Sequence, residues 1–260
     1  MMQFSLFEQI ALAIFLLSGI SFFLYHLLLR LKIILKGKSD FSIDQLPKRI
    51  ARVFDEVILH KKVASGKRKS AGILHALVMY GFIFFGLITI NHFGMAFGLP
   101  IFSDSIRHAY FLFFGAPWAI LCSIGILGLA YRRFVIKPEA LGKFSSTSAI
   151  VSVFIVTLMV TYLIDEFHIL SGAAEKFNWW LHSGVIGGFL FLIPQSKHMH
   201  LVLSPFNIFL RPFEVPSHGA IPIDMEASEE ELDNLLLDLS RLSKDQALDI
   251  FTCVECGRCT

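Results

Sequence analysis

The sequence predicts an all-α membrane protein, with a bundle of five transmembrane helices followed by a short soluble tail. Hydrophobic residues make up 55% of the 260 residues and charged residues only 17%, whereas soluble domains carry about 25% charged residues. Five apolar runs approach the roughly 17–25 residues that a membrane-spanning helix needs. Such runs must be helical, because lipid offers no partner for backbone amides. The net charge of +2 gives no indication of a nucleic-acid partner.

The expected spans cover residues 10–29, 71–90, 110–131, 148–164 and 179–200. The first four contain no Asp, Glu, Lys or Arg. The fifth reaches full length only if its helix continues past Pro194. Residues 1–210 are therefore expected to form the membrane domain.

The connections between spans predict the orientation. Lys and Arg are concentrated after the first and third spans, whereas the opposite connections carry Asp104, Asp165, Glu166 and Glu175. Cytoplasmic loops are enriched in Lys and Arg. The N-terminus is therefore expected outside and the C-terminus in the cytoplasm.

A further helix is expected over residues 45–63 in the first cytoplasmic connection. One apolar stripe runs along it at helical spacing and consists of Leu46, Ile50, Val53, Phe54, Val57 and Ile58. Basic residues line the remainder, which favours a helix on the inner membrane surface. The alternative is a small soluble helix that packs on the bundle.

Residues 211–260 are expected to form a linker, a soluble helix and the start of an iron–sulfur domain. The linker contains several prolines, and Ser228 with Glu231 has the spacing of a capping box. Near its end the chain contains "CVECGRC", in which two residues separate Cys253 from Cys256 and Cys256 from Cys259. This spacing matches the first three ligands of a bacterial [4Fe–4S] run, although a zinc site is the rival interpretation. The fourth ligand is missing, so the cluster is incomplete in this chain.

Histidines lie near both ends of the second and fifth spans. His75 and His92 are 17 residues apart, about 25 Å along a helix. His182 and His200 are 18 residues apart, about 27 Å if the helix is continuous. Because the two spans run in opposite directions, His75 matches the depth of His200, and His92 that of His182.

Two imidazoles facing each other across a bundle are suited to axial ligation of a haem iron. The sequence predicts two haems b, or one if only the inner pair binds. His198 is the alternative to His200 if Pro194 kinks the helix. His92 is the weakest candidate because it lies about 100° from His75 in helical phase. His26 is assigned a packing role and Cys122 that of a small core residue. Glycines in both spans offer space for a macrocycle: Gly81, Gly86, Gly184, Gly187 and Gly188.

The segments "HALVMYGF", "LHSG" and "PQSKHMH", together with the cysteine run, resemble the gamma subunit of respiratory nitrate reductase and its relatives. The nearer resemblance is to members fused to heterodisulfide-reductase-like iron–sulfur modules, because the gamma subunit itself lacks a ferredoxin motif. The resemblance implies a dihaem b domain in a bacterial or archaeal cell membrane. It further implies electron exchange between menaquinone or another quinone and a cytoplasmic iron–sulfur and CCG-domain module. It assigns His75 with His200 to the inner haem and His92 with His182 to the outer one.

A quinone site needs a nearby haem and groups that handle protons. The candidates are at the outer ends of the helices: Arg107, His108, Asp165, Glu166 and His168. The alternative for each residue is a solvated rim. The alternative function for the chain is a haem-free membrane anchor or a transporter that tethers an iron–sulfur domain.

Overall fold

The computed structural model describes residues 4–38, 41, 43–65, 69–142, 144–213 and 242–254. These residues contain helices and turns but no strand, which confirms the all-α prediction for the described part of the chain. The chain divides into two compact units. The first includes Met1–Ser21 and Lys62–Phe191, and the second includes Phe22–Lys61 and Leu192–Cys256.

Four long helices meet the length and composition of membrane spans. They are α1 (Leu6–Ile34), α3 (Lys69–Ala96), the continuous run Asp104–Ile136, and α6 (Ser146–Glu166). All four contain an expected span and extend beyond it at both ends. Their length and apolar composition are consistent with a membrane protein.

The third of these helices begins earlier than expected and contains two turns of π-helix. It runs through α4 (Asp104–Tyr110), the π-turn η3 (Phe111–Gly115), α5 (Ala116–Tyr131) and the π-turn η4 (Arg132–Ile136). Ser103 caps its first turn, because the Ser103 side chain accepts from the amide of Ile106. This early start matters for the site, since it places Arg107 on the helix rather than in a loop.

The expected continuous helix over residues 179–200 is wrong. Helix α7 (Gly172–Leu192) is followed by two short 3₁₀ turns, η6 (Ile193–Gln195) and η7 (Lys197–Met199). Pro194 has no amide hydrogen to continue the helix, and Ser196 is extended, with φ −131° and ψ 170°. The axial spacing calculated for His182 and His200 therefore does not apply.

The chain becomes helical again after this break. Helix α8 (His200–Leu210) contains Pro205. The second unit also contains α2 (Leu46–Val53), the π-turn η1 (Phe54–Ile58) and α10 (Lys244–Thr252). Helix α10 begins with a capping box formed by Ser243 and Gln246. The predicted capping box of Ser228 and Glu231 lies outside the described residues.

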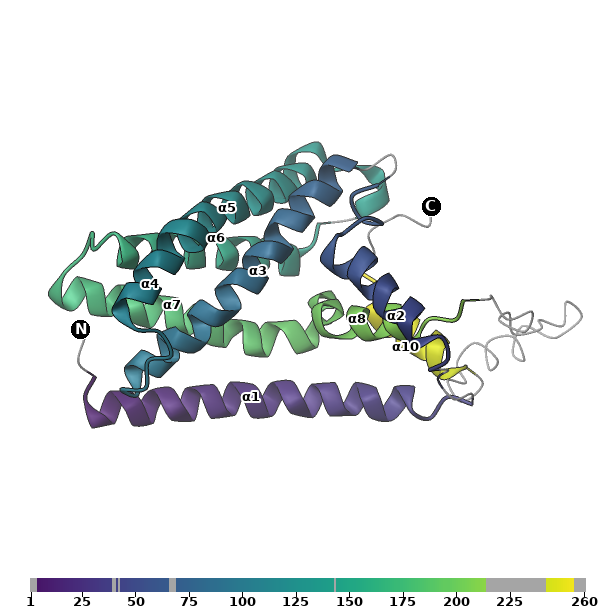
Figure 1. Cartoon of the computed structure of the whole chain (residues 1–260), viewed down its shortest axis with the longest axis horizontal. Helices are drawn as coiled ribbons and strands as arrows, with labels where there is room; N and C mark the ends of the chain where they lie inside the picture. The colour runs from purple at the N-terminus through teal and green to yellow at the C-terminus, as the bar shows by residue number, and fades with distance from the viewer. Residues whose placement is uncertain are drawn as a thin grey trace, which may run out of the picture. The chain divides into compact units, whose positions relative to one another are not determined.

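Each unit has its own apolar packing. In the first unit, α3 packs on α5 and α5 on α6 (Figure 1) around Phe111, Ala119, Cys122, Met159 and Tyr162. A second cluster there joins Leu12, Ala96 and Trp179. In the second unit, α8 packs against α2 and α10, and Ile34, Met199, Leu203, Ala247 and Leu248 form the core.

Candidate functional site

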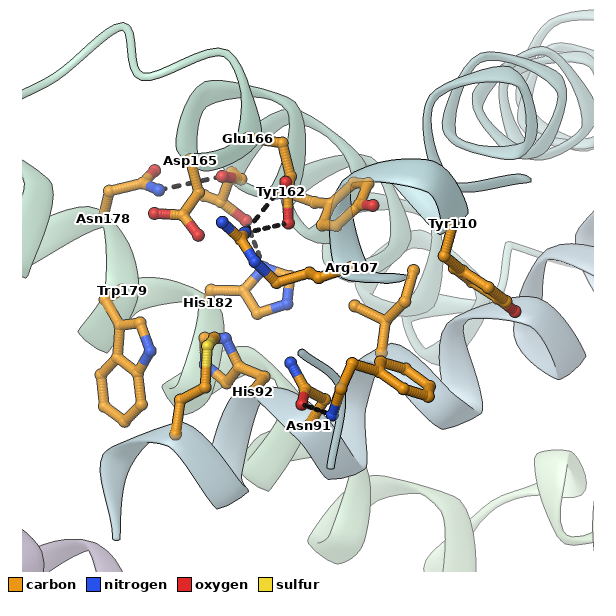
Figure 2. Close-up of a pocket in the computed structure, with 14 residues that line it drawn as sticks. Asn91, His92, Arg107, Tyr110, Tyr162, Asp165, Glu166, Asn178, Trp179 and His182 are labelled. Carbon is orange, nitrogen blue, oxygen red and sulfur yellow. Dashed lines mark hydrogen bonds and ion pairs between the residues drawn. The ribbon is translucent and has the colours of Figure 1, made fainter. Parts of the chain in front are cut away.

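A pocket in the first unit gathers polar and charged side chains from four helices. It contains about 530 Å³ of empty space, counted with its open mouth. Helices α3, α4, α6 and α7 supply most of its wall (Figure 2). The lining residues are Ile88, Asn91, His92, Met95, Phe102, Arg107, Tyr110, Thr161, Tyr162, Asp165, Glu166, Asn178, Trp179 and His182.

Two buried imidazoles meet in this pocket. His92 comes from α3 and His182 from α7, and their side chains are 7% and 8% exposed. Their ring centroids are 4.9 Å apart with an interplanar angle of 53°. Trp179 stacks on His92 at 4.6 Å. The structure therefore brings together the histidines that the resemblance assigned to the outer haem.

A threonine hydroxyl fixes the tautomer of His182. Thr161 Oγ1 lies 2.7 Å from the backbone oxygen of Thr157 and 2.7 Å from His182 Nδ1. A carbonyl oxygen carries no proton, so the single hydroxyl proton is donated to it. The hydroxyl must then accept from His182 Nδ1–H, which leaves the lone pair on Nε2. This is the tautomer in which Nε2 can bind a metal.

The second imidazole is held by a serine. His92 Nε2 lies 2.9 Å from the hydroxyl of Ser183, which is completely buried. This donor set suits axial ligation of a haem iron, because ligating histidines use one ring nitrogen for the metal and the other for a fixed hydrogen bond. The rings are in direct contact, so a flat macrocycle fits between them only if they move apart.

The other histidine candidates are distributed over the two units. His75 is half-buried in the first unit, whereas His198 and His200 are half-buried in the second. The rings of His198 and His200 are 6.2 Å apart, and His200 Nδ1 is bonded to the carbonyl of Lys197 at 2.8 Å. The inner pair of His75 with His200 or His198 therefore remains a prediction. His26 contacts the rings of Phe22 and Tyr25, in keeping with a packing role.

Three of the five quinone-site candidates line the pocket. Arg107 Nη1 donates to both carboxylate oxygens of Glu166, at 3.0 and 3.1 Å. The Nε of Arg107 is buried and has no hydrogen-bond partner among the described residues. Asp165 also faces the pocket. In the view of Figure 2, the Arg107 guanidinium lies between the two carboxylates and the two imidazoles. The remaining candidates, His108 and His168, are exposed and do not line it.

Sequence reasoning missed several polar residues of the pocket. Asn178 donates its side-chain amide to the carbonyl of Thr161 at 2.9 Å. The Asn91 side chain accepts from the amides of Ile101 and Phe102 and so holds the chain that leads to α4. Helical spacing indicates two of the missed pocket residues, Asn178 and Trp179, because both precede His182 by about one turn and lie on the same face. Nothing distinguished Thr161 from an ordinary threonine in an apolar helix.

The glycines of the two histidine helices have two different roles. A side chain at Gly81 would meet Cys122, one at Gly187 would meet Phe15, and one at Gly188 would meet Phe154. These three glycines therefore allow neighbouring helices to pack closely. A methyl group at Gly86 or Gly184 would meet nothing within 4 Å. Gly86 and Gly184 are exposed and do not line the described pocket, so the space expected for a macrocycle remains a prediction there.

The iron–sulfur prediction falls mostly outside the described residues. Cys253 is exposed and directly follows α10. Cys256 and Cys259 lie outside the described residues. Within the described ranges, no three His, Cys, Asp or Glu side chains gather as a metal-binding group. The three-cysteine ligand set therefore remains a prediction.

Two curated proteins resemble this chain, whereas no family model and no solved structure matches it. A probable iron-sulfur-binding oxidoreductase, FadF of Bacillus subtilis, is 30% identical over 268 residues, which cover 92% of this chain and 37% of FadF. An EtfAB:quinone oxidoreductase of Syntrophomonas wolfei is 22% identical over 293 residues, which cover 95% of this chain and 39% of that protein. The chain thus spans less than two fifths of each relative. Over nearly all of its own length, it is similar to two proteins that are named as oxidoreductases.

Proposed function

We propose that this chain is the membrane electron-transfer module of an oxidoreductase. It passes electrons between menaquinone or another quinone and a cytoplasmic iron–sulfur unit by way of b-type haem. One observation carries the proposal: two buried imidazoles from different helices share a pocket with an arginine and two carboxylates. Such a set combines the ligands of a redox cofactor with groups that bind and protonate a polar head group. The relatives' names agree with this chemistry, since one is iron-sulfur-binding and the other a quinone oxidoreductase.

His92 and His182 are the proposed axial ligands of the outer haem. The bound haem would supply one-electron redox chemistry at this level of the bundle. His182 would offer Nε2, because Thr161 holds its Nδ1. His92 would have to exchange its bond with Ser183 or use its other nitrogen. The inner haem is assigned to His75 with His200, or with His198 in its place.

The charged side of the pocket is the proposed quinone site. Reduction of a quinone to a quinol takes up two electrons and two protons, so the site must bind a carbonyl oxygen and supply protons. The unpartnered Nε–H of Arg107 is suited to donate to such an oxygen. The side chain of Asp165 forms no hydrogen bond or ion pair with the described residues, faces the pocket and is suited to carry the proton. Glu166 holds Arg107 in place.

The cytoplasmic end of the path is assigned to the cysteine run. Cys253, Cys256 and Cys259 would contribute three of the four thiolates of a [4Fe–4S] cluster. The cluster would need a fourth ligand in addition to this cysteine run. We propose an iron–sulfur and CCG-domain module as the partner that exchanges electrons with this cluster.

A visible spectrum of the purified, dithionite-reduced protein tests the proposal. We expect sharp b-type bands whose outer component is lost in His182→Ala and retained in His108→Ala, since His108 is exposed and outside the pocket. A colourless protein, or identical spectra for the two variants, would contradict the haem assignment. The colourless result would favour the membrane anchor or transporter.

The Thr161→Val variant refines this test. Valine keeps the shape of threonine but removes the acceptor for His182 Nδ1–H. Loss of such an outer hydrogen bond typically costs 10–100-fold in metal affinity or activity. We expect weaker retention of the outer haem and a shifted midpoint potential, whereas Thr157→Val, one turn earlier, retains both. Equal midpoint potentials in the two variants would show that Thr161 does not support His182 as a haem ligand.

A further inference from the structure

Helix α2 of the second unit buries a charged side chain and exposes apolar ones, which is the reverse of a soluble amphipathic helix. Arg49 is only 1% exposed. Four side chains form the exposed apolar stripe, namely Leu46 (49%), Ile50 (57%), Phe54 (53%) and Ile58 (39%). A helix that packs on a protein core normally buries the apolar face and exposes the charges.

Specific hydrogen bonds hold α2 in this orientation. Arg49 donates from Nη1 to the carbonyls of Phe209 and Arg211, at 2.8 and 3.2 Å. Arg52 donates to the Arg211 carbonyl at 2.6 Å. The last carbonyls of a helix have no partner within the helix, so these arginines satisfy the C-terminus of α8.

Two ion pairs also hold α2 and η1 in this orientation. The ion pair between Arg211 and Glu56 measures 2.5 Å, and Arg49 Nη2 pairs with Asp44 at 2.7 Å. Rotation of α2 to bury the apolar stripe would break these bonds and leave the last carbonyls of α8 without the arginine donors, which is costly. The exposed stripe is therefore a fixed feature of the unit.

The charge around the stripe indicates what covers it. Helix α1 is apolar and long enough to cross a membrane, and α2 follows it after a connection of 11 residues, 35–45. Exposed lysines lie in this part of the second unit: Lys32, Lys36, Lys38 and Lys48. Basic residues near an anionic leaflet are attracted to it. Lys48 lies on α2 itself, whereas the other three lie at the end of α1 or in the connection. Basic residues together with an exposed apolar stripe are typical of a helix that lies in a membrane interface.

We propose that the apolar stripe of α2 and η1 inserts into the boundary between head groups and acyl chains of an anionic leaflet. Helix α8 would then be held at the membrane surface through the arginines that cap it. This proposal does not depend on the redox function, because none of its residues lines the pocket of the first unit.

Photocrosslinking in lipid nanodiscs tests this contact. The full chain would carry p-benzoylphenylalanine at Phe54 in one variant and at Asp55 in the matched control. Adjacent residues lie about 100° apart on a helix, and the Asp55 side chain is 47% exposed, so both positions are accessible. We expect lipid adducts at position 54 in several-fold excess over position 55, identified by mass spectrometry. Replacement of phenylalanine by its benzoyl derivative conserves the ring and so preserves the fold.

Three outcomes would overturn the proposal. Equal lipid yields at the two positions would show that the stripe does not face the bilayer. Adducts to protein at position 54 would assign the stripe to a partner or to another part of the chain. Equal yields in phosphatidylglycerol and pure phosphatidylcholine discs would contradict the assignment to anionic lipid.

Discussion

Two arginines, Arg107 in the first unit and Arg49 in the second, are withdrawn from solvent in different ways. The side chain of Arg107 is 27% exposed and bonds only to Glu166, and its Nε has no partner among the described residues. Arg49 is 1% exposed and uses Nε, Nη1 and Nη2 in hydrogen bonds. Each buried polar group that lacks a partner costs about 1–3 kcal/mol.

The contrast separates a structural arginine from a functional candidate. Four of the five N–H groups of Arg49 donate to backbone carbonyls and to Asp44, so Arg49 acts by joining two helices. Arg107 has a buried donor, Nε–H, that finds no partner among the described residues at the wall of a pocket. Since a fold tolerates an unused buried donor only at a cost, Arg107 is the arginine to test for ligand binding.

The largest expected effect is that of Arg107→Gln on quinol-linked electron transfer. Loss of one preorganised donor in a water-poor site typically lowers a rate about 100-fold or more. We expect a fall of that order in steady-state electron transfer with a soluble quinol analogue. The double variant Arg107→Gln with Glu166→Gln should regain stability, because no carboxylate is left unpaired, but it should not regain activity.

A second ion pair in the same unit provides the matched control. Lys176 pairs with Glu8 at 2.7 Å, with side chains 37% and 19% exposed, and neither residue lines the pocket. Lys176→Gln should therefore leave electron transfer within about twofold, since exposed pairs contribute about 0–1 kcal/mol. An equal loss of activity in both variants would show that Arg107 acts through stability alone.

The next largest effect is that of Arg49→Met on the stability of the second unit. Methionine retains most of the apolar stem but leaves the carbonyls of Phe209 and Arg211 without this donor. At about 1 kcal/mol for each carbonyl, we expect a loss of about 2 kcal/mol. Amide hydrogen exchange in residues 200–210 would measure it as faster opening of α8.

Lys48→Met is the control for this variant, because Lys48 is the neighbouring residue on α2 and is exposed. Its effect should be about 0.5 kcal/mol or less, as for most surface substitutions. If Arg49→Met opened α8 no faster than Lys48→Met, the capping role of Arg49 and the distinction between the two arginines would both fail.

The sequence predicted the features that depend on composition and missed those that depend on helix orientation. Four long apolar helices were predicted correctly, because length and apolar content alone define them. The fifth was not, because a proline either kinks a helix or ends it, and Ser196 provides a cap for the turn that follows Pro194. The amphipathic pattern predicted α2, but it could not show that Arg49 would be buried against the end of another helix.

Sequence reasoning about the pocket was limited in the same way, because it could not place one helix relative to another. Matching depths predicted that His92 and His182 would be near each other, and they are. The argument against His92 compared its phase with that of His75 on the same helix. That comparison carries no information about where the neighbouring helix lies. Thr161 and Ser183 were missed for a related reason, since a hydroxyl in an apolar helix usually bonds to its own backbone.

The smallest expected effect concerns Asp245. This residue tests whether a buried polar atom without a partner always marks a functional residue, as proposed for Arg107. Its Oδ1 is buried without a hydrogen-bond partner among the described residues, yet it does not line the described pocket. Burial, and then the nearby Asp249, raise the pKa of Asp245, and Arg49 lowers it. A carboxylate with a raised pKa stabilises the fold fully only below its unfolded-state pKa, and this contribution is lost as the pH rises through the folded-state pKa.

Asp245→Asn should therefore stabilise the docking of α10 at pH 7 by at most about 0.5 kcal/mol, and this gain should disappear in acid. The attraction of a carboxylate to a helix N-terminus opposes the gain, which is one reason why it is small. Asp249→Ala is the opposite case, because Asp249 accepts from the side-chain amide of Asn207 at 2.8 Å, and alanine removes this acceptor, which should weaken docking. Hydrogen exchange of α10 at two pH values, corrected for intrinsic rates, would measure both. If Asp245→Asn instead destabilised α10 at pH 7, its unpartnered oxygen would have a partner in solution. An unsatisfied buried atom would then point to a function only where, as at Arg107, it also faces a pocket.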